Sequence, residues 1–194
     1  SGIPVILVDT LIKSDNYSAA YMTDNVEAGR TAANELLNRL KESGLSETET
    51  AQVAIQVGST GSQTINDRVK GFNEYWEANA PENWVVLNDD IKVNDGDISK
   101  AVGFCQDFLT TYPDLNGSTV GFVTGLMESK RTDITMIGFD FSSEIETMIR
   151  SGEYDVASVV QRQYYMGYDG VQKALELANG GTVAEKSVDT GVIM

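Results

Sequence analysis

Two patterns of apolar residues alternate along this chain, and the alternation limits the folds that it can adopt. Short runs rich in β-branched residues, such as residues 134–139, are typical of strands buried on both faces. Longer segments with apolar residues at helical spacing, such as residues 27–44, separate these runs. Such alternation predicts an α/β fold in which helices cover both faces of a mostly parallel sheet.

The expected elements cover most of the chain. The expected strands are 3–9, 18–25, 51–58, 83–89, 134–139, 154–161 and 186–194. The expected helices are 27–44, 63–80, 98–113, 118–129, 142–152 and 166–181. Gly44 stops the first helix, and Pro81 ends the second.

One connection departs from the alternation. Between the helices expected at 98–113 and 118–129, the segment "PDLNG" is rich in turn-forming residues where a parallel sheet needs a return strand. Two interpretations follow: a direct helix–helix connection, or residues omitted between Asn116 and Gly117. The need for a return strand favours the second, and we predict an omitted strand of about five to eight residues.

Charge and composition exclude several classes of function. The 194 residues include 14 basic and 29 acidic side chains, for a net charge of −15. A surface this acidic repels phosphate backbones, so nucleic-acid binding is not expected. The chain has no histidine, the usual catalytic base and metal ligand. Its one cysteine, Cys105, lies in an apolar helical pattern and is expected to be a buried structural thiol.

Polar side chains follow several of the expected strands, at the edge where open α/β sheets bind ligands. These residues are Asp9, Ser59–Ser62, Asp140 and Gln161. Helix capping is the alternative for two of them: Asp140 for the helix that begins near Ser142, and Ser62 for its own helix. Asp9 and Gln161 precede no obvious helix, which favours a site.

Arg68 lies about two turns into the helix at 63–80, opposite its apolar face. A solvent-facing salt bridge with Asp67 or Glu74 is one interpretation. A side chain leaning toward the helix N-terminus would instead reach the loop where the strand ends gather. Carboxylates, a guanidinium and an amide together suit a neutral ligand rich in hydroxyls, and they indicate binding more than chemistry.

Other motifs do not support a catalytic or metal site. "GSTGS" lacks the Lys-Ser/Thr of a phosphate loop, and "DDIKVNDGD" places apolar residues at calcium-ligand positions. A Ser-His-Asp set is excluded without histidine. Asp9 and Asp140 stay open as a carboxylate pair for glycoside hydrolysis. We therefore expect no cofactor and no metal.

The chain resembles the sugar-binding proteins of bacterial ABC transporters, of the ribose/galactose type. Six segments carry this resemblance in the family's order: "GIPVILVDT", "YMTDNVEAGRTAANEL", "SQTINDRVKGF", "ITMIGFD", "YDVASVVQRQYYMGYDGVQKALEL" and "KSVDTGV". The resemblance implies a type I periplasmic-binding-protein fold of two doubly wound lobes. Residues 1–24 and 162–187 would belong to the first lobe, and 25–161 and 188–194 to the second. A complementary segment of the first lobe is expected in the intact protein.

The resemblance also implies roles for individual residues. Asp9, Arg68, Asp140 and Gln161 match the family's strand-end carboxylate, the arginine of "RxxGF", the carboxylate of "GFD" and the hinge amide. Thr64 and Asn116 complete the expected set of ligand-binding residues. The chain departs from the family at Thr10, often an arginine in ribose binders, and near Asn94, where the family often has an aromatic ring.

The expected function is an extracytoplasmic solute-binding protein, in the periplasm or on the cell surface. It would bind a monosaccharide or similar polyol between its lobes and deliver it to the membrane permease of an ABC transporter. We expect it to be monomeric and not an enzyme. Two alternatives stay open: the effector domain of a lactose-repressor-type regulator, and an α/β hydrolytic enzyme.

Overall fold

The computed structural model describes residues 2–119 and 122–194, and the chain divides into two compact units. One comprises the chain up to Asp24 together with Val160–Ile193, and we call it the small unit. The other comprises Asn25–Val159 with Met194, and we call it the large unit. In the part of the chain that the structure describes, no helix is both long and apolar enough to cross a membrane.

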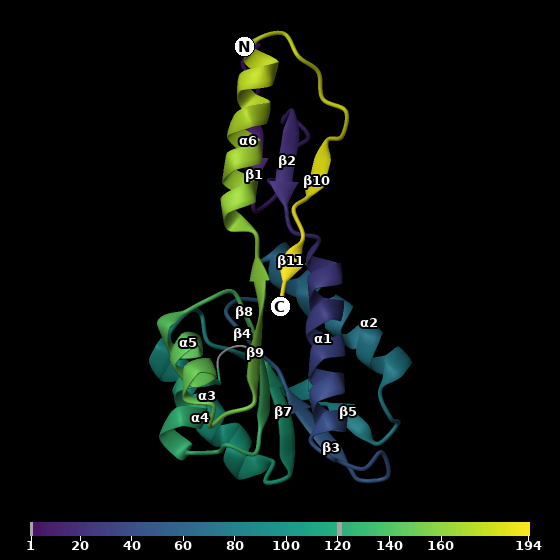
Figure 1. The fold of residues 1–194 in the computed structure, drawn as a ribbon, viewed down its shortest axis with the longest axis vertical. Helices are drawn as coiled ribbons and strands as arrows, with labels where there is room; N and C mark the ends of the chain where they lie inside the picture. The colour runs from purple at the N-terminus through teal and green to yellow at the C-terminus, as the bar shows by residue number, and fades with distance from the viewer. Residues whose placement is uncertain (1, 120–121) are drawn as a thin grey trace. The chain divides into compact units, whose positions relative to one another are not determined.

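The large unit is built around five parallel strands in the order β9–β8–β7–β3–β5 (Figure 1). Their bounds are β3 Ala51–Ala54, β5 Trp84–Val86, β7 Leu115–Thr119, β8 Thr135–Phe139 and β9 Val156–Gln161. Two shorter strands, β4 (Gln56–Val57) and β6 (Lys92–Val93), pair separately. This is the doubly wound order, in which the chain reverses its direction of winding between β3 and β7.

Helices cover both faces of this sheet (Figure 1). One face carries α1 (Asn25–Glu42) and α2 (Gln63–Asn79). The other carries α3 (Ile98–Thr111), α4 (Val123–Ser129) and α5 (Ser143–Ser151). A short 3-10 helix, Asn88–Asp90, precedes β6. The predicted alternation of parallel strands and helices is thus confirmed.

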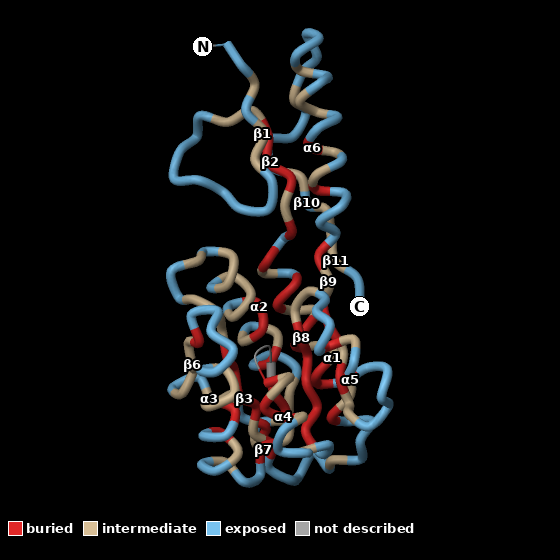
Figure 2. Tube along the Cα trace, turned by 90° about the vertical axis from the view of Figure 1, so that its left-hand side faces the viewer, coloured by how far each residue is buried: buried red, intermediate tan, exposed pale blue. Residues whose placement is uncertain are grey.

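The core of the large unit lies on the two faces of its sheet, seen as the buried trace of β7 and its neighbours in Figure 2. On the α3–α5 face, aromatic, aliphatic and sulfur-containing side chains form one cluster around Phe108, Phe122 and Met136. On the other face, α1 buries alanines and leucines, among them Ala33 and Leu36, each fully buried. The small alanines allow α1 to lie close to the sheet.

The prediction of an omitted strand was wrong, and so was that of a direct helix–helix connection. Residues 115–119 themselves form β7, which pairs with β3 on one side and β8 on the other. The helix expected at 118–129 begins only at Val123, and residues 120 and 121 of that prediction lie outside the described residues.

The composition of β7 explains the error. Asn, Gly and Ser have low strand propensity and are typical of turns. Here close packing requires small residues: a Cβ on Gly117 would lie 3.2 Å from side-chain carbons of Leu36 and Val53. Ser118 is fully buried. The tertiary position of the strand therefore overrides its local preference.

The small unit has a three-stranded parallel sheet in the order β1–β2–β10. Its strands are β1 Ile6–Val8, β2 Ala19–Met22 and β10 Ser187–Asp189, and α6 (Gln163–Ala178) packs on β1 and β2. The short β11 (Val192–Ile193) pairs antiparallel with Val160 and Gln161. The assignment of lobe boundaries at 24, 161 and 187 stays a prediction.

The small unit buries few residues and exposes many apolar ones. Its cluster of buried residues contains Ala19, Tyr21 and Met166. Exposed apolar side chains lie on both of its layers, on β1 and the segment before it and along α6: Ile3, Val5, Val8, Tyr164, Tyr165, Tyr168, Val171 and Leu175. The spacing 164, 168, 171 and 175 places one stripe of them on a single face of α6.

The contact between α1 and α2 in the large unit depends on two glycines. A Cβ on Gly29 of α1 would lie 2.1 Å from the carbonyl oxygen of Arg68, and a Cβ on Gly71 of α2 would lie 1.9 Å from that of Val26. Both distances are far inside van der Waals contact, so the two backbones touch directly. Any side chain at either position would force the helices apart.

We expect Gly71→Ala to lower the free energy of unfolding by about 1–3 kcal/mol or more, the range for overpacking, because the added methyl meets rigid backbone. Gly103→Ala on α3 is the matched control. Nothing lies within 4 Å of a Cβ there, so better helix propensity should leave stability unchanged or raise it by about 1 kcal/mol. Urea unfolding followed by circular dichroism measures both variants. Equal midpoints for Gly71→Ala and the unsubstituted protein would contradict this account of the crossing.

Candidate ligand site

Arg68 points into the large unit from the second turn of α2. Its Nε donates a 2.9 Å hydrogen bond to Oδ1 of Asn25, the first residue of α1, which is only 4% exposed. Its guanidinium carbon lies 4.5 Å from the centroid of the Phe139 ring, at the end of β8. A cation over an aromatic face at this distance is an attractive arrangement. Three elements therefore fix one side chain.

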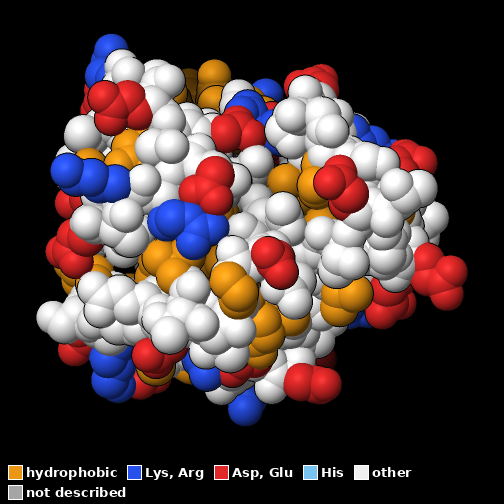
Figure 3. Space-filling view, turned by 90° about the horizontal axis from the view of Figure 1, so that it is seen from below, with side chains coloured by type: hydrophobic (Ala, Val, Ile, Leu, Met, Phe, Trp, Pro, Cys, Tyr) orange, Lys and Arg blue, Asp and Glu red, His pale blue; other side chains and the backbone are white. Residues whose placement is uncertain are grey.

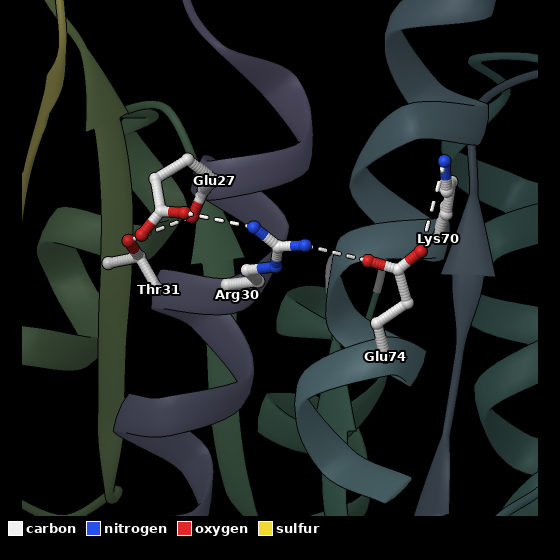
Figure 4. A network of polar contacts seen from close by, with 5 residues as sticks. All are labelled: Glu27, Arg30, Thr31, Lys70 and Glu74. Atoms are coloured by element: carbon white, nitrogen blue, oxygen red, sulfur yellow. Dashed lines mark hydrogen bonds and ion pairs between the residues drawn. The ribbon is translucent and has the colours of Figure 1, made fainter. Parts of the chain in front are cut away.

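The alternative of a solvent-facing salt bridge is not supported by the contacts of its expected partners. Glu74 pairs instead with Arg30 of α1 at 2.8 Å and with Lys70 at 3.8 Å (Figure 4). Asp67 accepts a 2.7 Å hydrogen bond from the side chain of Gln63.

Arg68 lines a pocket of about 120 Å³ at the C-terminal edge of the sheet. The wall is mostly apolar and comes from the segment after β3, from α2 and from the end of β8: Ile55, Gln56, Val57, Gly58, Ile65, Val69, Phe72 and Phe139. The chain reverses its winding between β3 and β7, and ligands of doubly wound sheets bind beyond the strand ends at that point. The pocket lies beyond the end of β3.

A buried amide pair supports one side of this pocket. Gln56 is 1% exposed, and its side chain donates to the carbonyl of Ala101 at 3.1 Å and accepts from Asn94 at 2.8 Å. Asn94 in turn accepts a 2.9 Å hydrogen bond from the Gly96 backbone. Asn94, near the position where the family often has a ring, does not line the pocket and instead helps to hold Gln56, which does.

Asp140 follows β8 with a backbone φ of 61°, in the left-handed region. Its N–H donates to the carbonyl of Val159 at 2.8 Å, and its carbonyl accepts from the hydroxyl of Ser158 at 2.5 Å. Asp is one of the few residues that tolerate this conformation. Two hydrogen bonds to β9 thus hold the half-buried Asp140 at the edge of the sheet.

The capping interpretations of the strand-end residues are corrected by the structure. The N-cap of α5 is Ser142, whose hydroxyl accepts from the Ile145 N–H at 3.2 Å, so Asp140 does not cap this helix. Ser62 does occupy the N-cap position of α2, but its side chain makes no capping hydrogen bond.

Asp9 lies in the small unit and resembles Asp140 in its backbone. It follows β1 with a φ of 73°, and the Thr10 N–H donates to the Val8 carbonyl at 2.9 Å across it. These are features of a classic γ-turn, a rare and strained conformation. The Thr10 hydroxyl donates to the Asp9 carboxylate at 2.9 Å. Asp9 is exposed, and Gln161, at the end of β9 in the same unit, is 7% exposed.

The two remaining predicted residues differ in position. Thr64 lies half-buried in the first turn of α2, one turn before Arg68. Asn116 lies near the start of β7, at the N-terminal edge of the sheet, where its Oδ1 accepts from the Gln52 N–H at 3.1 Å. It lines two hollows there together with Asp133. Asn116 is therefore not at the edge that holds Arg68 and Asp140, which argues against its expected role.

That opposite edge, the lower end of the large unit in Figure 1, carries charges of both signs. Acidic side chains are spread over the face drawn in Figure 3, and basic ones lie among them. Arg39 pairs with Glu35 at 2.6 Å and with Asp155 at 2.5 Å, and Arg131 pairs with Asp133 at 2.7 Å. Pairing with Asp133 raises the pKa of Arg131 and lowers that of Asp133. These pairs are structural features of the surface.

Sequence reasoning missed Asn25 and Phe139. Asn25 begins a helix and is easily taken for an ordinary helix-start residue. Phe139 continues a buried apolar run and is easily taken for core. No local pattern signals that they meet Arg68, because the contact joins residues 43 and 71 positions apart in the chain (68 − 25 and 139 − 68).

Comparisons with known proteins agree with this geometry. Residues 1–182 match the family model described as "Periplasmic binding protein domain", and the chain belongs to that family. No curated protein matches the chain. The predicted fold class, a type I periplasmic-binding-protein fold present in part, is thereby confirmed.

Two solved structures show the likeness. One is a carbohydrate transporter solute-binding protein from Agrobacterium radiobacter in complex with D-arabinose (29% identity, TM-score 0.86). The other is an ABC transporter solute-binding protein from Agrobacterium vitis with bound D-fucose (26% identity, TM-score 0.83). This chain is covered to 98% in each comparison and spans 65% of the length of each of the two proteins.

Cys105, the one cysteine of the sequence, is a packing residue rather than a reactive thiol. It is fully buried on α3, as predicted, and a Cβ on Gly125 of α4 would lie 2.6 Å from its sulfur. Burial raises the pKa of the Cys105 thiol from 9.0 to about 12. A neutral, enclosed thiol is a poor nucleophile, which supports a packing role.

We expect a disulfide reagent at pH 8 to modify Cys105 only as fast as the folded structure opens, and at once in urea. Because the folded thiol has the higher pKa, its contribution to stability is complete below pH 9 and decreases as the pH rises toward 12. Labelling followed by mass spectrometry, with and without denaturant, measures this. Rapid modification of the native protein, at the rate of a free thiol peptide, would contradict the assignment.

Proposed function

We propose that the protein binds a monosaccharide or similar polyol outside the cytoplasm and delivers it to the membrane permease of an ABC transporter. The observation that carries this proposal is the arrangement around Arg68. Its guanidinium is held over Phe139 in a pocket beyond the end of β3. In the same sheet, β8 ends at Phe139 and is followed directly by Asp140.

The chemistry of these groups suits a sugar. An arginine donates hydrogen bonds to two neighbouring hydroxyls, and a carboxylate accepts from two. The apolar wall of the pocket suits the C–H face of a sugar ring. We propose Arg68, Asp140 and Thr64 as ligand contacts of the large unit. Asp9 and Gln161 keep, as proposals, the role that the resemblance implies.

The related structures favour transport over the alternatives. Two relatives above 25% identity are solute-binding proteins with a bound sugar, and a third, from Hahella chejuensis (26% identity, TM-score 0.80), is the periplasmic component of an ABC-type sugar transport system. These proteins are binding components rather than enzymes or regulators. We propose the same for this chain, acting as a monomer.

We expect Arg68→Ala in the full-length protein to weaken sugar binding by about 2–5 kcal/mol, because it removes a charged hydrogen-bond donor from the hydroxyls of the ligand. Titration calorimetry with D-arabinose, D-fucose and a panel of other pentoses and hexoses measures the loss.

Lys70→Ala is the matched control for that variant. Lys70 lies on the same helix, is 62% exposed and pairs with Glu74, so binding should be unchanged. Arg68→Ala binding a sugar as tightly as the unsubstituted protein would remove Arg68 from the site.

We also expect binding without turnover. The chain has no histidine and its one thiol is buried, so it offers no histidine-activated serine or cysteine nucleophile, and only a carboxylate pair could cleave a glycoside. Incubation with pentoses, hexoses and their aryl glycosides, followed by chromatography, should return each ligand unchanged. Product in excess of the protein concentration would favour the hydrolase interpretation, with Asp9 and Asp140 as the carboxylates to substitute first.

A further inference from the structure

We propose that Asn25 and Phe139 are positioning residues, which fix the guanidinium of Arg68 in the orientation that meets a ligand. This inference rests on the proposed function, because it concerns the same site. It means that Asn25 and Phe139 contribute to ligand affinity, although neither is among the ligand-binding residues predicted from the sequence or from the family resemblance.

Asn25 fixes the plane of the guanidinium. Its Oδ1 accepts from Nε, the nitrogen that joins the guanidinium to the side-chain stem, at 2.9 Å. A hydrogen bond at Nε restricts rotation of the whole planar group, whereas it engages neither terminal nitrogen. Asn25 is 4% exposed, so this hydrogen bond is shielded from competing water.

Phe139 covers one face of the same plane. Its ring centroid lies 4.5 Å from the guanidinium carbon, within the range of a strong cation–π contact. A ligand therefore meets the outer edge or the opposite face of the group. Phe139 directly precedes Asp140. The end of β8 therefore carries both the ring that supports the Arg68 donor and the Asp140 carboxylate that can accept hydrogen bonds.

The helix crossing sets the distance between Asn25 and Arg68. Asn25 lies four residues before Gly29 on α1, and Arg68 lies three residues before Gly71 on α2. At these spacings each lies on the same helix face as its glycine, one turn away. Because the backbones touch at Gly29 and Gly71, the short Asn25 side chain reaches Arg68 directly.

The consequence is preorganisation of a long side chain. A free arginine loses much of its rotamer freedom when a ligand immobilises it, and that loss weakens binding. Here Asn25 and Phe139 already restrict the side chain in the folded protein. Removing either residue should therefore weaken ligand binding even if Arg68 remains present.

The test is a double-mutant cycle on the full-length protein, with D-arabinose and D-fucose as probes. Asn25→Ala should lower the affinity about tenfold or more, as expected for loss of a hydrogen bond to a charged group. Asn25→Asp keeps the acceptor and should stay within about threefold of the unsubstituted protein, within the scatter of such context effects. Phe139→Leu should weaken binding, and Phe139→Tyr, which keeps the ring, should not.

Arg68→Lys tests whether Asn25 acts through Arg68, because a merely structural role of Asn25 would give the same loss of affinity with lysine as with arginine at position 68. Lysine has no Nε–H at that position, so Asn25→Ala should have little further effect in the Arg68→Lys background. An equal loss in both backgrounds, or no loss in either, would overturn the positioning role.

A nuclear magnetic resonance experiment separates this inference from the proposed function. The Nε–H signal of Arg68 should exchange slowly with solvent in the unsubstituted protein and in Asn25→Asp, and fast in Asn25→Ala. If neither sugar nor any of the panel binds, the proposed function fails, and this exchange still decides whether Asn25 fixes Arg68. Fast exchange in the unsubstituted protein would refute the inference.

Discussion

The direct contact between the backbones of α1 and α2 is the constraint on which the site of the large unit depends. Two glycines, Gly29 and Gly71, permit it, and at both positions a methyl group would lie about 2 Å from a carbonyl oxygen. Glycine lowers helix propensity by about 1 kcal/mol, so its presence in the middle of two helices indicates a tertiary requirement. The close contact also brings Asn25, at the start of α1, within hydrogen-bonding distance of Arg68. In "RVKGF" the glycine of the packing contact lies three residues after Arg68, the arginine that we propose as a ligand contact.

A second constraint acts at the ends of strands. Asp140 in the large unit and Asp9 in the small unit both have left-handed backbone conformations directly after a parallel strand. This conformation turns the chain sharply at the edge of the sheet, and hydrogen bonds from neighbouring strands hold it: Val159 and Ser158 for Asp140, Tyr21 for Asp9. Strained residues of this kind persist only where the surrounding structure determines them. A glycine would relieve the strain but would remove the carboxylate, which is consistent with a role in binding.

The sequence was informative where local pattern and tertiary role agree. The alternation of strands and helices and the burial of Cys105 follow from the spacing of apolar residues. For Arg68 the tilt of helical side chains indicated an inward direction only as one of two open interpretations. The pattern failed at β7, because Asn116, Gly117 and Ser118 read as a turn until the neighbouring strands and Leu36 are in place. The expected position of Asn116 in the site failed for the same reason: because β7 was not recognised as a strand, the sequence could not show that Asn116 lies near its N-terminal end. The roles of Asn25 and Phe139 depend on contacts between distant segments, and no local pattern reports those.

In the function that we propose, the site of the large unit serves recognition rather than reaction. Its one cation lies among apolar walls in a chain of net charge −15, so its orientation, rather than the overall field, has to select the ligand. Neutral polyols gain little affinity from long-range electrostatic attraction. Their hydroxyls bind more tightly to donors and acceptors that are already held in the correct orientation. An amide that holds Nε, a ring beneath the guanidinium and a carboxylate fixed by its backbone provide this without any group that must gain or lose a proton. The absence of histidine from the sequence is no disadvantage to such a site, because hydrogen bonding to hydroxyls needs a fixed geometry and not a titratable base near neutral pH.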